Sequence, residues 1–183
     1  MSRHVVDSSV VIKWFAPEVH SADALRHLDP DIERDAPELL LAESSNILWK
    51  QVGRGELTRA EAERIAGDLE HADITIHPMG SLFLPGLRTA MVTDRTSYDS
   101  ICLAPSDSLS TKVVTADRRL YNALQGGPYA RLILWGRGWS MISIDFDGKT
   151  LATIAARSAR ILQLARASTP ELVPPSEWRL ARA

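Results

Sequence analysis

The sequence predicts an α/β fold: a three-layer α/β/α sandwich with a mostly parallel central sheet, followed by a C-terminal helical extension. Short β-type runs alternate with helical patterns along the chain, which is typical of parallel sheets covered by helices. The 183 residues suit one domain with an appendage, and 45% of them are hydrophobic, enough for a buried core.

The first elements follow from apolar runs and their boundaries. Residues 4–6 form a short apolar strand that ends at Asp7. Ser8 or Ser9 can cap the helix expected over residues 10–15, because a hydroxyl at that position accepts a hydrogen bond from a free backbone N–H.

Residues 20–52 are predicted to form a helix, a loop and a second helix. A helix is predicted over residues 20–28, and the acidic stretch 29–35 is predicted to be a loop. Pro37 suits the first turn of a helix over residues 37–52, and two glycines follow, where a helix commonly ends.

The later elements are supported by caps and apolar spacing. Thr58 and Glu61 have the spacing of a capping box, which predicts a helix over residues 59–70. Pro105 is expected to bend or shorten the helix that begins near residue 98. The remaining strands are predicted at 74–77, 112–115, 132–135 and 141–144, and the remaining helices at 82–92, 98–103 (reaching toward 109), 118–124 and 150–167.

Composition excludes several classes of protein. The single cysteine, Cys102, excludes an intramolecular disulfide framework and a multi-cysteine zinc site, and it fits a cytoplasmic protein. No apolar run approaches the roughly 20 residues of a membrane helix. The formal net charge of −2 argues against a strongly basic nucleic-acid binder.

The charge divides the chain into an acidic body and a basic tail. Residues 1–148 carry 15 Lys and Arg against 21 Asp and Glu, a balance of −6, whereas residues 149–183 carry 6 against 2, a balance of +4. We therefore expect one domain over residues 1–147 and a basic C-terminal helix and tail over 148–183, which we expect to pack against the acidic body.

Four acids stand where a purely structural role is least expected. Asp7 and Asp117 each directly follow a predicted strand, and the carboxyl ends of parallel strands line the ligand crevice of α/β folds. A helix cap is the alternative for each of these two acids taken alone. Glu43 lies among apolar residues on its helix, so it must be paired, bound to a metal or raised in pKa; a salt bridge is the plain alternative. Asp99 falls in the first turn of its helix, where compensation of the helix dipole is the alternative.

Clustered carboxylates indicate a hard divalent cation. Like charges at one sheet edge repel, and Mg²⁺ or Mn²⁺ prefers oxygen ligands and carries water that can attack a phosphodiester. The sequence lacks the Gly-rich loop of a P-loop NTPase, and Ser9 occupies the position where a haloacid-dehalogenase-type phosphatase needs a second acid.

The residues around these acids resemble the motifs of PIN-domain nucleases. The motifs are Val5-Val6-Asp7-Ser8-Ser9-Val10, Leu41-Ala42-Glu43 with Asn46, Tyr98-Asp99-Ser100, and Thr115-Ala116-Asp117-Arg118-Arg119-Leu120. They cover roughly residues 3–125 in the family's order, and the most similar subgroup is that of the VapC-like ribonuclease toxins of type II toxin–antitoxin modules.

The resemblance implies a Mg²⁺-dependent endoribonuclease that forms a homodimer and is held inactive by a cognate antitoxin. It implies that Asp7, Asp99 and Asp117 bind metal, while Glu43 helps to hold the metal or positions the attacking water. Ser9 and Thr115 can support the acids by hydrogen bonds or simply cap helices, and Asn46 belongs to the same supporting set.

The remaining expectations concern the substrate and the competing functions. Lys13, Arg118 and Arg119 lie near the expected acidic site and can meet RNA phosphates. Trp14 can stack on a base, although an aromatic residue beside apolar neighbours favours a place in the core or a dimer interface. The alternative functions are a catalytically weak PIN-fold module that binds RNA or protein, and a receiver-type phosphoacceptor domain, which would need adjacent acids after the first strand.

Overall fold

The structure is a computed structural model that describes residues 2–16 and 21–136. Its strands form one five-stranded, fully parallel sheet in the order β3-β2-β1-β4-β5, which confirms the predicted α/β class. The strands are β1 (Ser2–Val6), β2 (Ile32–Pro37), β3 (Thr75–His77), β4 (Lys112–Thr115) and β5 (Ile133–Trp135). The strand predicted at 141–144, the helix predicted at 150–167 and the basic tail lie outside the described residues.

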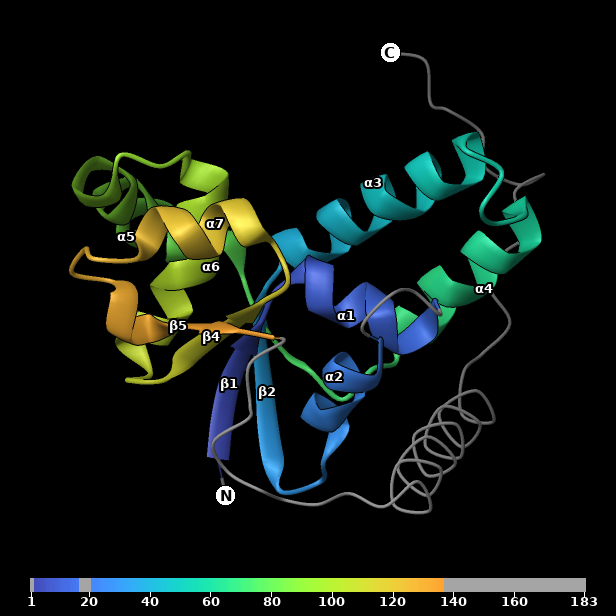
Figure 1. Ribbon diagram of the computed structural model, residues 1–183, viewed down its shortest axis with the longest axis horizontal. Coiled ribbons are helices and arrows are strands. Elements are labelled where there is room, and N and C mark those ends of the chain that lie inside the picture. The colour runs from blue at the N-terminus through green and yellow to red at the C-terminus, as the bar shows by residue number, and fades with distance from the viewer. Residues whose placement is uncertain (1, 17–20, 137–183) are drawn as a thin grey trace, which may run out of the picture.

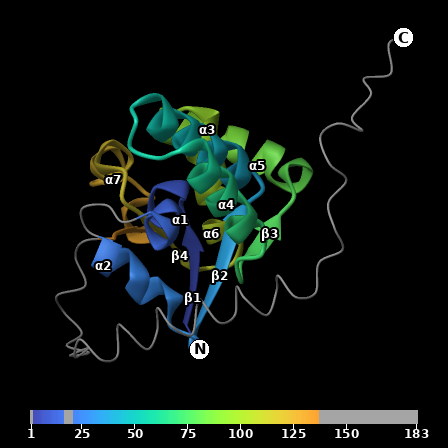
Figure 2. The same cartoon turned by 90° about the vertical axis from the view of Figure 1, so that its right-hand side faces the viewer.

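Helices cover both faces of this sheet (Figure 1). One layer contains α1 (Ser8–Phe15), α2 (Ser21–Leu25), α3 (Leu39–Gly53) and α4 (Arg59–Glu70), and Figure 2 views the molecule from that side. The other layer contains α5 (Met79–Thr93), α6 (Ser97–Ser108) and α7 (Arg118–Leu124). Two short 3-10 helices, Arg26–Leu28 after α2 and Ala130–Leu132 before β5, complete the described elements.

The alternation of side chains along the strands divides the core between the two layers. Val5 and Val113 are register partners, and both pack against α6 and α7. Val6 and Val114, one residue later, point to the opposite face and pack against the α1 layer. Because these central strands are buried on both faces, they read in the sequence as continuous apolar runs.

Strand β2 corrects the loop predicted over residues 29–35. Its residues Arg34 and Asp35 are charged, which hid the strand signal, yet both are buried. Arg34 forms an ion pair with Asp73 at 2.8 Å, and Asp35 pairs with Arg3 at 2.8 Å. Partners distant in the sequence therefore make a charged central strand tolerable, and the following helix begins at Leu39 rather than at Pro37.

Some helix boundaries and caps predicted from local signals are confirmed, and others are wrong. The Thr58–Glu61 capping box is present, and α4 begins at Arg59 as predicted. Helix α3 ends at Gly53, and α7 spans the predicted residues 118–124. The caps predicted at Ser8 or Ser9 are wrong, because Asp7 holds the N-cap position of α1 without a side-chain cap bond.

Two prolines lie inside helices instead of ending them. Helix α5 begins at Met79, so that Pro85 falls in its interior, and α6 continues past Pro105 to Ser108. The expected shortening at Pro105 is therefore wrong. Residues 100–106 of α6 are all buried, and this packing holds the helix together where a backbone hydrogen bond is missing.

Helices α5 and α6 approach each other closely at Gly86. A Cβ atom at this position would lie 2.7 Å from Cγ1 of Ile101, so only glycine fits without a shift of the neighbouring side chain. Within residues 2–16 and 21–136, no helix is long and apolar enough to cross a bilayer.

Candidate active site at the carboxyl edge of the sheet

Asp7 is a buried carboxylate held by hydroxyl groups. It follows β1 directly, and the residue is 7% exposed. The hydroxyl of Thr115 donates a hydrogen bond of 2.7 Å to Asp7 Oδ2, and the hydroxyl of Ser9 donates to the same oxygen. Among the described residues, no lysine, arginine or histidine forms an ion pair with it. The negative charge of Asp7 thus has no counter-charge from the protein's described part.

The hydroxyls of Ser9 and Thr115, which bind Asp7, are fixed by backbone N–H groups at the end of β4. The Thr115 hydroxyl oxygen accepts the backbone N–H of Asp117 at 2.9 Å, and the Ser9 hydroxyl oxygen accepts the N–H of Ala116, also at 2.9 Å. These bonds join the end of β1 to the end of β4. Both hydroxyls therefore form the hydrogen bonds to Asp7 that the expected supporting role requires.

Glu43 reaches Asp7 from α3. The Ser8 hydroxyl donates to Glu43 Oε2 at 3.0 Å and lies 3.5 Å from Asp7 Oδ1, so it spans the two carboxylates. Within the described part of the chain, Glu43 forms no salt bridge, so the plain alternative for this residue finds no partner there. Sequence reasoning treated Ser8 only as a cap and missed this contact.

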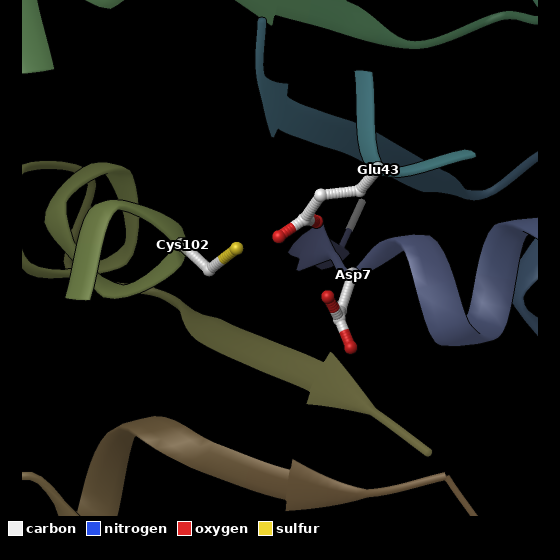
Figure 3. Close-up of side chains that lie close together, drawn as sticks. All are labelled: Asp7, Glu43 and Cys102. Atoms are coloured by element: carbon white, nitrogen blue, oxygen red, sulfur yellow. The ribbon is translucent and has the colours of Figure 1, made fainter. Parts of the chain in front are cut away.

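Cys102 is the third group that converges on this point. One carboxylate oxygen of Asp7, one of Glu43 and the Cys102 Sγ atom all lie within 4.8 Å of one another, and Figure 3 shows the sulfur atom directed toward the Glu43 carboxylate. Sequence reasoning missed Cys102. The signal was its position three residues after Asp99, which places both side chains on one face of α6.

The pKa values show that the acids act on one another. Burial raises the pKa of Asp7, against the hydroxyl hydrogen bonds, which lower it. Burial, the charge of Asp7 and the charges of Asp99 and Asp117 together raise the pKa of Glu43 to about 7, against the hydrogen bond from Ser8, which lowers it. Burial, followed by the nearby acids, raises the pKa of the Cys102 thiol well above its ordinary value, so the thiol stays protonated at neutral pH.

Asp99 and Asp117 lie at two helix N-termini, outside the group formed by Asp7, Glu43 and Cys102, and both act on Glu43 through their charge. Asp99 is half-buried in the first turn of α6, which Thr96, and not Ser97, caps by accepting the N–H of Asp99. Asp117 is exposed at the N-cap of α7, and its Oδ1 accepts the N–H groups of Arg119 at 2.7 Å and Leu120 at 3.3 Å. One oxygen of Asp117 therefore caps the helix, which leaves Oδ2 for the site.

The other expected site residues divide into two groups. Lys13 and Arg118 line one cavity beside the acids, whereas Arg119 does not line it. Asn46 is exposed on α3, and no hydrogen bond joins it to the four acids in the described part of the chain. The indole N–H of Trp14 donates to the carbonyl oxygen of Ala24 at 2.9 Å, and the partly buried ring packs against the core.

The donor set fits a hard divalent cation. Carboxylate oxygens are the ligands that Mg²⁺ and Mn²⁺ prefer, and the buried Asp7 carboxylate, whose described partners are hydroxyl and backbone N–H groups, gains a counter-charge when a cation binds. Protonation also removes the repulsion between the buried carboxylates. Because the pKa of Glu43 is raised to about 7, a proton competes with the metal for this carboxylate near neutral pH.

Three comparisons with known proteins identify the family and support the fold. The family model of the PIN domain matches residues 4–124, about two thirds of the chain. The chain is 28% identical over 118 residues to ribonuclease VapC3 of Pyrobaculum aerophilum, which covers 63% of this chain and 90% of that protein. The crystal structure of PAE2754 from Pyrobaculum aerophilum superposes with a TM-score of 0.51 at 20% identity, over 87% of this chain and 90% of the other, and so supports the fold.

Proposed function

The chain belongs to the PIN-domain family, and on that premise we propose that it is a Mg²⁺-dependent endoribonuclease, with Mn²⁺ as an alternative cofactor. One observation carries the proposal: Asp7 and Glu43 lie together with no cation from the described part of the protein, and the charges of Asp99 and Asp117 reach the same point. The relative named as a ribonuclease supports RNA as the substrate.

Each acid has a defined task in this proposal. Asp7, Asp99 and Asp117 hold the metal, and Glu43 completes the ligand set or accepts the proton of the attacking water. The metal, when bound, supplies a water of lowered pKa and neutralises charge on the phosphate. Ser9 and Thr115 fix the orientation of the Asp7 carboxylate, and Ser8 holds Glu43 beside it.

The direct test is RNA cleavage by the purified protein with and without a chelator. We expect cleavage in millimolar Mg²⁺ or Mn²⁺ and none in excess EDTA, with recovery when the metal is added back. Undiminished cleavage in EDTA would overturn metal dependence. Retained RNA binding without any cleavage in either metal would instead support the catalytically weak binding module.

We further propose that the protein is the toxin of a type II toxin–antitoxin module and acts on RNA in the cytoplasm. The support is the relative's name, VapC3, together with the family match. Expression should arrest growth, and co-expression of a short open reading frame next to this gene should relieve the arrest. Equal toxicity of the wild type and Asp99→Asn, at matched protein levels, would contradict this role.

A homodimer is the assembly that the exposed surface supports best. Helix α5 presents a run of large apolar side chains to solvent, and Phe83 and Met91 are each 70% exposed. An exposed apolar face of this kind marks an interaction surface. We expect a dimer in sedimentation equilibrium for the wild type and a monomer for Phe83→Glu; a monomeric wild type would exclude this assembly.

A further inference from the structure

A cavity of about 170 Å³ lies where α1, α2, β5 and the start of α7 meet, and the residues on either side of Asp117, Ala116 and Arg118, line it. Its lining residues are Val10, Lys13, Ala24, Ala116, Arg118, Trp135 and Gly136. Figure 1 shows α1 and α7 rising from the same edge of the sheet. The cavity is not part of the metal site described above.

The wall of the cavity is shared with the acidic site. Ala116 lines the cavity and donates its backbone N–H to the Ser9 hydroxyl that holds Asp7. Trp135 lines the cavity and is the register partner of Thr115, the other residue that bonds to Asp7. A ligand inside the cavity would therefore contact Ala116 and Trp135, and each of these residues adjoins a hydroxyl residue that bonds to Asp7.

Gly136 keeps the end of β5 free of side-chain atoms. Its N–H donates to the carbonyl oxygen of Thr115 at 2.9 Å. A Cβ atom added there would lie 3.3 Å from that carbonyl oxygen and 3.7 Å from Cγ2 of Val10, and would take up space at the cavity.

The lining combines an apolar interior with two cations and no acid. Lys13 and Arg118 supply the positive charge, while the other five residues are apolar or glycine. This composition contrasts with the neighbouring acidic site, which repels phosphate unless a metal cation is bound there. A ligand that fits both the apolar lining and the two cations must have a compact apolar part joined to anionic groups. A nucleotide unit of an RNA strand has that chemistry.

We propose that this cavity binds one nucleobase of the RNA strand next to the phosphodiester that is cleaved, with Lys13 and Arg118 contacting the flanking phosphates. The inference rests on the proposed ribonuclease function and adds a determinant of its sequence selectivity. The volume supports a single base, because pockets for whole drug-sized ligands are about 300–1,000 Å³. Arg118 directly follows Asp117, which connects the phosphate contact to the acidic site along the chain.

The test measures kcat/KM in Mg²⁺ for one short RNA and for a series in which each nucleotide near the cleavage site is replaced in turn by an abasic ribose. For the wild type, removal of the base at one position should lower kcat/KM about ten-fold. Ala24→Leu, which fills the cavity from α2, should lower cleavage of the intact RNA to that same level and leave cleavage of the abasic RNA unchanged. Ala24→Val is the milder variant if the leucine protein does not fold.

The controls separate this inference from the function on which it depends. Arg118→Gln should weaken cleavage of intact and abasic RNA alike, and more than Arg119→Gln, the adjacent arginine outside the cavity. An unchanged rise in melting temperature on Mn²⁺ addition should show that the acids of Ala24→Leu are intact. If RNA is cleaved but no abasic position matters, or if Ala24→Leu lowers cleavage of both substrates equally, the base-binding role is wrong. If no RNA is cleaved at all, the proposed function fails and the base-binding role fails with it.

Discussion

Asp7 and Asp35 are two buried aspartates on neighbouring parallel strands, and their surroundings differ completely. Asp35 in β2 is fully buried, with Arg3 Nε 2.8 Å from one oxygen and His77 Nε2 2.7 Å from the other. Asp7 at the end of β1 is 7% exposed; within the described residues its hydrogen bonds come from hydroxyl groups and the backbone N–H of Ser8, and Glu43 lies beside it.

The difference shows how a structural carboxylate can be told from one in an active site. A buried charge is tolerated when its partners are part of the fold, as at Asp35. Where the described residues surround a buried carboxylate with hydroxyls and further acids, its charge is relieved by protonation or by a bound cation. Asp35 therefore has the surroundings of a structural carboxylate, and Asp7 has the surroundings that the proposed metal site requires.

The largest expected effect is on catalysis at Asp7. Asp7→Asn should lower RNA cleavage at least about 1,000-fold, since loss of a metal ligand removes several kcal/mol of transition-state stabilisation. The measurement is a single-turnover assay in Mg²⁺, together with a melting curve that shows the variant is folded. A variant that retains cleavage within ten-fold of the wild type would show that Asp7 does not hold the metal.

The matched variant in the other region is Asp35→Asn. It should lower the free energy of unfolding by about 2 kcal/mol, because Arg3 and His77 lose their ionised partner. Cleavage per folded molecule should stay within about two-fold of the wild type. Urea unfolding and the same cleavage assay measure both quantities. A stable but inactive Asp35→Asn protein would erase the distinction between the two aspartates.

The pH dependence of stability sharpens the comparison at Glu43. Its pKa is about 7 in the folded protein against an ordinary 4.5, so the folded state holds a proton that the unfolded state has released. Without metal, wild-type stability should therefore fall as the pH rises from about 4.5 to 7, and Glu43→Gln should lose about 1–2 kcal/mol less over that range, after allowance for solvent screening. Urea melts in EDTA at several pH values measure the difference; parallel curves would contradict the raised pKa.

The smallest expected effect concerns Asp117. Its charge raises the pKa of both Asp7 and Glu43, so Asp117→Asn should stabilise the metal-free protein by about 0.5–2 kcal/mol. The asparagine oxygen can still accept the N–H groups of α7, so the cap remains. The variant should melt higher in EDTA and lose this advantage in millimolar Mg²⁺. A lower melting temperature in EDTA with an unchanged Mg²⁺ response would make Asp117 a structural cap alone.

Much of the fold could be predicted because its signals are local. The Thr58–Glu61 pair lies within one helical turn, and the apolar runs of β1 and β4 are buried on both faces. The acids after these strands followed from the rule that the carboxyl ends of parallel strands meet at one edge. The helix over 118–124 was predicted with its cap residue in place.

The rest was decided by contacts between residues far apart in the chain. The strand at β2 depends on Arg3 and His77, which are 32 and 42 residues from Asp35, so the charged segment 29–35 resembled a loop until its partners were placed. The hydroxyl of Thr115 is 108 residues from Asp7.

The sequence by itself therefore determined the fold class, most helices and the identity of the four acids, since periodicity, caps and strand ends depend on neighbouring residues. Only the tertiary structure placed Ser8 between two carboxylates and Cys102 beside them, and only it formed the cavity of Lys13 and Arg118. The physical reason is that burial and pairing of charge depend on which strands and helices meet, and the parallel sheet brings together segments that no local pattern connects.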